Sequence, residues 1–142
     1  MRYLLDTNVI TELRKARTRA IDPAVSAWTD SVDAGDLFLS AITIMEIEKG
    51  IAQVARRDVA QADRLREWFE TAVLTEFSER ILPFETEAAR YCARLHMPDK
   101  RSANDAIIAA IAWQHHMVLV TRNEKDFSGM GAQLLNPWAW PR

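Results

Sequence analysis

The amino-acid sequence has little cysteine, little glycine and no long run of apolar residues. Cys92 is the single cysteine, which excludes an intrachain disulfide and gives no sign of an oxidising compartment. The four glycines form no glycine-rich phosphate-binding loop. Apolar runs such as 106–113 fall far short of the ~18 residues that a membrane-spanning helix needs. Too few apolar residues precede Asp6 for a secretory signal, so we expect a cytoplasmic protein that does not associate with a membrane.

An excess of positive charge is also missing. The formal net charge is -2 and the sequence pI is about 5.9. A protein that holds nucleic acid over a broad phosphate-binding surface is usually more basic than this. A nucleic-acid substrate would therefore have to be held locally, with a metal ion offsetting nearby acidic groups.

The sequence does contain enough apolar residues for one hydrophobic core. Hydrophobic residues make up 49% of a chain of 142 residues, which suits one domain. We predict a single domain over residues 1–142, in which 136–142 form a C-terminal tail.

Short apolar runs alternate with amphipathic segments along this chain. The runs predict strands at residues 2–5, 36–39, 80–83, 117–121 and 132–135. The amphipathic segments predict helices at 7–15, 23–31, 41–57, 59–76, 85–97 and 103–116. Ser40 is a suitable N-cap for the third of these helices. Strands that alternate with helices indicate an α/β fold, in which a parallel sheet carries helices on both faces.

Acidic and amide side chains follow the predicted strands. Asp6 comes directly after the first strand, and Glu46 lies one turn into the helix after the second. Asp105 lies in the first turn of a later helix, and Asn123 and Asp126 follow the fourth strand. Ligands of open parallel sheets bind beyond the carboxyl ends of the strands, so we expect these side chains to meet at one edge.

Carboxylates gathered at one edge favour a metal site. They repel one another, which raises their pKa values unless a cation is present. Mg²⁺ and Mn²⁺ are hard cations that prefer oxygen ligands. Such a site can activate water for in-line displacement at phosphorus, so the pattern favours phosphodiester hydrolysis.

Each of these acidic residues also has a structural interpretation. Asp6 is well placed to cap the helix that follows it, and Asp126 to cap a turn. Glu46 and Asp105 each follow a Ser or Thr by three residues, the spacing of a capping box. Spacing alone leaves both interpretations open, although the convergence of four acids at strand ends favours the metal site.

A series of motifs resembles the PIN-domain family. The segment LLDTNVITEL at 4–13 is similar to the opening of PIN domains, especially the VapC and FitB toxins of type II toxin–antitoxin systems. The resemblance continues in the expected order through LSAITIMEIEKGI (39–51), ILPF (81–84), NDAIIAAIA (104–112), VTRNEKDF (120–127) and NPW (136–138). These motifs span nearly the whole chain, and the NPW ending resembles the FitB branch.

This resemblance implies a single PIN-like domain whose sheet has about five parallel strands. It also implies an acidic pocket that binds Mg²⁺, and Mn²⁺ is expected to substitute for Mg²⁺. It implies endonucleolytic cleavage of RNA by a toxin that forms a homodimer. It also implies inhibition by a small VapB- or FitA-like antitoxin, through which alone contact with DNA is expected.

The motifs also imply roles for individual residues. Asp6 and Asp105 would be the principal metal ligands, and Glu46 would complete the acidic set directly or through water. The fourth catalytic position belongs to Asn123 or Asp126, because relatives carry the acid at one place or the other.

Polar neighbours of the acids are candidate supporting residues. Thr7 and Asn8 flank Asp6 and are placed to orient its carboxylate or a bound water, and Thr121 ends its strand in a similar position. Asn123 belongs to the same supporting set. Helix capping is the alternative role for Thr7 and Asn8.

The densest basic stretch is RKARTR at residues 14–19. Arg14, Lys15 and Arg17 follow the first helix and are candidate contacts for RNA phosphates near the mouth of the pocket. The alternative is a solvated helix C-terminus, where the helix dipole favours positive charge.

Two competing functions fit parts of the pattern. A phosphotransfer protein would use Asp6 as phosphoacceptor, but haloacid-dehalogenase-like phosphatases carry a second Asp where this chain has Asn8. Receiver domains carry a pair of acids after the first strand, which is missing here. The main alternative is a non-catalytic PIN-like scaffold that binds RNA or protein. Asn123 favours that alternative, whereas the presence of Asp6, Glu46 and Asp105 argues against it.

Overall fold

A computed structural model of the protein describes residues 1–141, apart from the side chain of Arg17. Five strands form one sheet in the order β3-β2-β1-β4-β5, and all neighbouring strands are parallel. The strands are β1 (Tyr3–Leu5), β2 (Leu37–Ser40), β3 (Ile81–Leu82), β4 (Val118–Val120) and β5 (Leu134–Leu135). All five predicted strands are therefore confirmed, with ends that differ by at most two residues.

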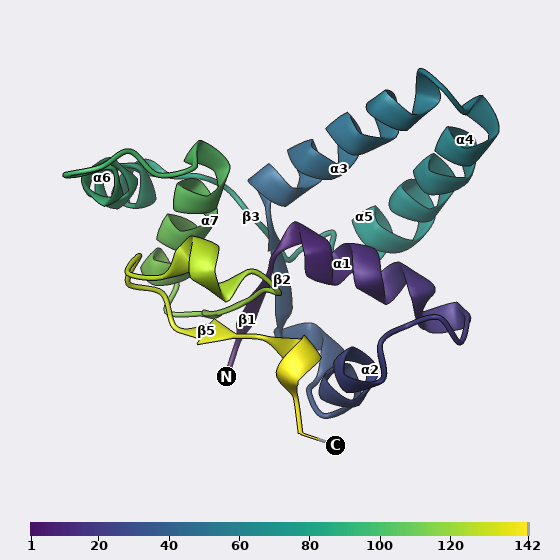
Figure 1. The fold of residues 1–142 in the computed structure, drawn as a ribbon, viewed down its shortest axis with the longest axis horizontal. Coiled ribbons are helices and arrows are strands. Elements are labelled where there is room, and N and C mark those ends of the chain that lie inside the picture. The colour runs from purple at the N-terminus through teal and green to yellow at the C-terminus, as the bar shows by residue number, and fades with distance from the viewer. Residues whose placement is uncertain (142) are drawn as a thin grey trace.

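Helices cover both faces of the sheet (Figure 1). The α-helices are α1 (Thr7–Leu13), α2 (Pro23–Asp30), α3 (Ala41–Ala55), α4 (Val59–Trp68), α5 (Leu74–Glu76), α6 (Thr86–Leu95) and α7 (Ala103–Gln114). The short 3-10 helices are η1 (Arg14–Arg17), η2 (Ala34–Asp36), η4 (Glu124–Phe127) and η5 (Pro137–Ala139). α6 and α7 pack on one face, and α1 to α4 pack on the other, as the alternation of strands and helices predicts.

The central strand β1 separates two hydrophobic cores. Side chains alternate across a strand, so Leu4 lies in the core beneath α6 and α7, whereas Leu5 lies in the core beneath α1 to α4. Both leucines are fully buried, as expected for a strand in the middle of a parallel sheet. In register, Leu5 pairs with Val120, so the residues that follow β1 and β4 emerge side by side.

α7 is buried along most of its length. Its buried residues are Ala106, Ile108, Ala109, Ala110, Ile111 and Ala112. Asp105 lies just before this buried stretch, in the first turn of the helix. Within the described chain, no helix is long and apolar enough to cross a membrane.

The predicted helix at 59–76 is helical throughout, but it is not α-helical over its whole length. The chain is α-helical over α4, widens into a π-helical turn, η3 (Phe69–Val73), and ends in α5. Phe69, Val73 and Phe77 are all buried and follow one another at intervals of four residues. This interval exceeds the ~3.6 residues of an α-helical turn, so a wider turn helps keep all three side chains on the core face.

Candidate active site

A pocket of about 460 Å³ opens at the carboxyl edge of the sheet, beside the ends of β1 and β4. Its wall comes from α1 and the residue before it, α3, α7, the loop after β4, and η5. The lining residues are Asp6, Thr7, Asn8, Thr11, Glu12, Glu46, Asp105, Arg122, Asn123 and Trp138. Three acids that the sequence predicts for the site, Asp6, Glu46 and Asp105, thus lie around one cavity.

Asp6 is held by three hydrogen bonds. Its Oδ1 accepts from the Thr7 backbone N–H at 2.8 Å, and its Oδ2 accepts from Thr121 Oγ1 at 2.8 Å and Asn8 Nδ2 at 3.2 Å. The side chain is buried. Burial raises the pKa of Asp6 and the charge of Glu46 adds to the rise, while the three hydrogen bonds oppose it. The structure therefore orients this carboxylate firmly at some electrostatic cost.

Glu46 reaches from α3 towards α1 and α7. Its Oε1 accepts a hydrogen bond of 2.6 Å from Thr7 Oγ1, and its Oε2 accepts one of 3.4 Å from Asn104 Nδ2. Ser40 is the N-cap of α3, as predicted, so Glu46 lies inside the helix and takes no part in a capping box with Thr43. The structural interpretation of Glu46 is therefore wrong.

The pKa of Asp105 is affected by the other acids of the site. Burial raises its pKa, and the charges of Asp6, Asp126 and Glu46 raise the pKa further, against a hydrogen bond with Ser102 that lowers it. The part of the shift that comes from these three charges is the mutual repulsion expected of converging carboxylates.

Asn123 and Asp126 occupy different positions relative to the pocket. Asn123 lines the pocket, and its backbone N–H donates to Thr121 Oγ1 at 3.0 Å. Asp126 lies in η4, outside the lining residues, where its backbone N–H donates to the Asn123 carbonyl at 3.0 Å. Its charge still contributes to the raised pKa of Asp105. Asn123 thus belongs to the pocket wall, whereas Asp126 lies outside it.

The acids fit a hard cation that keeps several of its own waters. In the part of the chain that the structure describes, no three His, Cys, Asp or Glu side chains are arranged to hold a metal ion together. Mg²⁺ often binds through one or two carboxylates and retains several waters, so it does not require three. Burial, and to a smaller extent the neighbouring carboxylates, raises the pKa of Asp6 and of Asp105, and a bound cation would favour the ionised form of both.

Two of the predicted phosphate contacts, Arg14 and Lys15, have described side chains, and both lie outside the pocket lining. Lys15 Nζ pairs with Glu12 Oε1 at 3.0 Å. The guanidinium carbon of Arg14 lies 6.0 Å from the centre of the Trp68 ring. The side chain of Arg17 lies outside the described residues. Neither Arg14 nor Lys15 lines the pocket, although Lys15 pairs with Glu12, which does.

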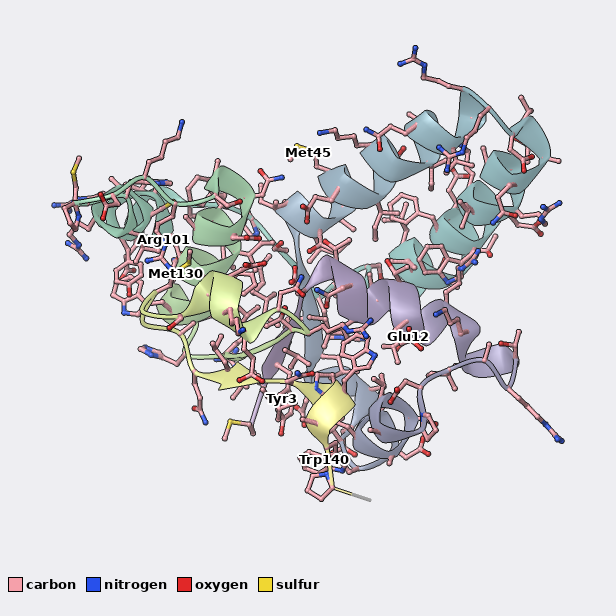
Figure 2. The ribbon with its side chains drawn as sticks, viewed as in Figure 1. Tyr3, Glu12, Met45, Arg101, Met130 and Trp140 are labelled. Carbon is pink, nitrogen blue, oxygen red and sulfur yellow. The ribbon has the colours of Figure 1, made fainter. Side chains whose placement is uncertain are left out.

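The sequence pattern does not predict Glu12 as a pocket residue. Glu12 lies on α1, where Figure 2 labels it, and is 8% exposed. Burial raises its pKa, but hydrogen bonds from the Asp22 backbone N–H at 2.8 Å and from Lys15 outweigh burial and hold the pKa below its usual value. The spacing of four residues between Asn8 and Glu12 places both on one helical face, and this was the available signal.

Arg122 and Trp138 are two further pocket residues that the pattern does not predict as such. Arg122 adjoins Asn123 in the VTRNEKDF motif, so its position was a usable signal. Trp138 belongs to the C-terminal tail and reaches the pocket only because η5 packs back against α2.

Comparison with known proteins identifies the family. The family model of the PIN domain matches residues 3–132. The chain belongs to the PIN-domain family. A VapC ribonuclease of Sinorhizobium fredii, Y4jK, is 39% identical to this PIN domain, over 95% of this chain and 96% of its own length. Toxin FitB of Neisseria gonorrhoeae is 35% identical, over 95% of this chain and 97% of its own length.

Solved structures agree with this assignment. A chain in the structure of FitAB bound to a DNA fragment has a TM-score of 0.84 and 34% identity, covering 99% of this PIN domain and 98% of that chain. FitAcB from Neisseria gonorrhoeae gives a TM-score of 0.83 at 34% identity, covering 96% of this chain and 99% of that one. The resemblance to VapC/FitB-type toxins and the predicted α/β fold are therefore confirmed.

Proposed function

We propose that this chain, a VapC/FitB-type ribonuclease toxin, hydrolyses RNA phosphodiester bonds with Mg²⁺ held at Asp6 and Asp105. The observation that carries the proposal is the convergence of Asp6, Glu46 and Asp105, from three separate elements, on one pocket. PIN-domain ribonucleases typically depend on a metal. Mg²⁺ is the metal proposed here, with Mn²⁺ as a substitute, because all the acidic donors are oxygen atoms.

Each acid has a distinct part in this proposal. Asp6 and Asp105 would bind the metal directly, and Glu46 would do so through water. When bound, the metal supplies a Lewis acid that activates water and offsets charge at phosphorus. Glu46 Oε1 is occupied by the short bond from Thr7, which leaves Oε2, with its longer 3.4 Å contact to Asn104, to accept a proton from a pocket water.

The residues around the acids keep them in this arrangement. Thr121 and Asn8 orient Asp6, and Thr7 orients Glu46. Asn123, in the pocket wall, offers a neutral amide that contacts water or substrate without adding to the negative charge. We assign Asp126 a supporting electrostatic role, because it lies outside the lining residues while its charge acts on Asp105.

The proposed partners are a small VapB- or FitA-like antitoxin and a second copy of this chain. The antitoxin would inhibit the toxin by blocking the pocket, and contact with DNA would occur only through it. A relative with 34% identity is seen as FitAB bound to a DNA fragment, which supports this kind of assembly.

The deciding experiment is cleavage of total bacterial RNA by purified, antitoxin-free protein. We expect fragments with Mg²⁺ or Mn²⁺, none with EDTA, and none from Asp6→Asn. Asp63→Asn is a matched control, because it removes the same charge from an exposed position on α4. If folded wild-type protein cleaves nothing with either metal, the ribonuclease proposal fails and the non-catalytic scaffold replaces it.

A further inference from the structure

Arg122 and Trp138 form a pair at the wall of the acidic pocket. The guanidinium carbon of Arg122 lies 5.1 Å from the centre of the Trp138 ring, and both residues line the pocket. We propose that this pair holds the substrate: Arg122 binds a backbone phosphate of the RNA, and Trp138 keeps the guanidinium in position. The inference rests on the ribonuclease function proposed above and names the residues that bind its substrate.

Arg122 brings a positive charge to a pocket wall that is otherwise acidic. The acidic lining residues are Asp6, Glu12, Glu46 and Asp105, and Arg122 alone is basic among the described residues that line the pocket. A phosphate that approaches several carboxylates is repelled by them. A fixed positive group beside them lowers this repulsion where the phosphate has to enter.

The guanidinium of Arg122 is not engaged by an acid. Among the described side chains, which leave out Arg17, the ion pairs join Lys15 to Glu12, Arg66 to Glu48 and Arg80 to Glu76. Stacking on an indole ring stabilises the cation and leaves its planar fork of N–H donors for another partner. Such a fork matches the oxygens of a phosphate, to which arginine often donates two hydrogen bonds.

Arg80 shows what an occupied guanidinium looks like in this protein. Its guanidinium carbon lies 5.2 Å from the centre of the Phe77 ring, much as Arg122 lies over Trp138. Arg80 also donates to the Leu37 carbonyl and to Glu76, both at 2.9 Å. Its donors therefore serve the fold, whereas the described residues form no such bonds with the Arg122 guanidinium, and Arg122 lines the pocket.

The backbone holds Arg122 beside the reacting groups. Its N–H donates to Asn8 Oδ1 at 3.3 Å, and the next N–H, of Asn123, donates to Thr121 Oγ1 at 3.0 Å. Asn8 and Thr121 are also the side chains that bind Asp6 Oδ2. The same two side chains therefore fix the backbone of residues 122 and 123 next to the central carboxylate.

Trp138 is anchored independently of Arg122. Its backbone N–H donates to Asn136 Oδ1 at 3.0 Å, and its ring packs against the core that contains Trp28. A partly buried ring on a packed 3-10 helix gives the guanidinium a firm surface, which limits the entropy that arginine loses when it binds phosphate. Trp138 is therefore a positioning residue.

The first test measures KM, kcat and binding on one RNA. The probe is a fluorescein-labelled oligonucleotide that spans the strongest site cut by wild-type protein, and binding is measured in EDTA, where it is not cut. We expect Arg122→Gln to raise KM and Kd by ~10-fold, as for one lost charge-assisted hydrogen bond. The slope of log Kd against log salt should fall in magnitude by ~0.7, the value for one phosphate on a single strand.

Arg94→Gln is the matched control for this test. Arg94 is also exposed, and its guanidinium carbon lies 5.4 Å from the centre of the Tyr91 ring, on α6 and away from the pocket. This variant should leave KM and the salt slope unchanged. Unchanged KM and slope in an Arg122→Gln variant that still cleaves RNA would overturn the inference. Failure of the wild type to cleave would instead contradict the proposed function.

The second test asks whether Trp138 acts through Arg122. Trp138→Phe keeps a ring and should keep wild-type affinity, whereas Trp138→Leu should raise Kd several-fold. In the Arg122→Gln background, Trp138→Leu should have no further effect on Kd, since coupled residues are not additive. If Trp138→Leu raises Kd equally in the wild-type and Arg122→Gln backgrounds, the positioning role is overturned. Trp138 would then contact RNA or support folding independently of Arg122.

Discussion

Among single residues, the buried acids show most directly how the site is built. Asp6 and Asp105 have raised pKa values, mainly because they are buried, and Glu12, on the same pocket wall, has a lowered one because Asp22 and Lys15 donate to it. Ionisation of these acids on one pocket wall thus has opposite effects on the stability of the fold. Asp6 and Asp105 cost stability when they are ionised, whereas ionised Glu12 adds to it.

The first prediction concerns how these acids change stability with pH. The pKa of Asp105 is higher in the folded state than in the unfolded state. At pH values between these two pKa values the folded state therefore binds more protons, and the free energy of unfolding falls as pH rises through this range. In EDTA, Asp105→Asn should therefore raise Tm relative to wild type, with a difference that is small near pH ~4 and grows towards pH ~7. Thermal unfolding monitored by circular dichroism at several pH values measures this difference.

Glu12→Gln is the control with the opposite sign. The lowered pKa of Glu12 stabilises the fold above its unfolded pKa, and this contribution is lost as pH falls through the folded value. The variant should therefore lose Tm relative to wild type near neutral pH and lose less in acid. The same pH trend in both variants would contradict the electrostatic account of the pocket.

The second prediction concerns the hydroxyl of Thr7. Its 2.6 Å hydrogen bond orients Glu46, so Thr7→Val should lower kcat by ~10-fold, as is typical when a group that orients a metal-site carboxylate is lost. Thr7→Ser should restore most of the rate. The control Thr29→Val removes a hydroxyl whose hydrogen bond, among the described residues, stays within its own helix α2, at the Val25 carbonyl. Wild-type kcat in a folded Thr7→Val variant would remove Thr7 from the mechanism.

Among the elements, strand register and helix starts decide which groups meet. Leu5 pairs with Val120, and the Asp6 N–H donates to the Val120 carbonyl at 2.9 Å, which brings Thr121 beside Asp6. α3 begins directly after β2, so the start of that helix determines where Glu46 lies.

The third prediction therefore concerns the N-cap of α3. Ser40 Oγ accepts from the Thr43 N–H at 3.2 Å, and Ser40→Ala should cost ~1 kcal/mol of stability. Asp58→Ala removes the N-cap of α4, whose side chain accepts from the Gln61 N–H at 3.0 Å, and should cost a similar amount. Urea unfolding and kcat, measured together, should show a loss of kcat in Ser40→Ala only. Equal kcat in the two variants would contradict the claim that the start of α3 positions Glu46 in the site.

For the whole molecule, the sheet order brings residues far apart in sequence into one pocket. β1 lies in the centre of the sheet, with β2 on one side and β4 on the other, so α1, α3 and the loop after β4 begin next to one another. A ligand that joins Asp6 to Asp105 therefore links α1 to α7 across the two cores.

The fourth prediction follows from that linkage. A metal that binds only the folded chain stabilises all of it, by ~2.7 kcal/mol at ~100 times Kd. Mn²⁺ should therefore raise the Tm of the wild type by several degrees, and Asp105→Asn should lose most of this rise. Asp63→Asn should keep it. An equal rise in wild type and Asp105→Asn would show that the stabilising metal binds elsewhere.

Local patterns predict most of the elements, because short apolar runs and helical spacing are set by neighbouring residues. The strands differ from prediction by at most two residues at each end. The π-helical turn η3 is not predicted, because a four-residue spacing such as that of Phe69 and Val73 also occurs on ordinary α-helices, and only packing in the core decides the width of the turn.

The sequence by itself determined the alternation of strands and helices and the presence of acids after the strands, because both are local properties of the chain. Only the tertiary structure decided which polar groups share the pocket. It places Asn123 in the wall and Asp126 outside it, and it brings Trp138 of the tail against Arg122. These contacts depend on sheet register and on the packing of η5 against α2, which join residues that no local pattern connects.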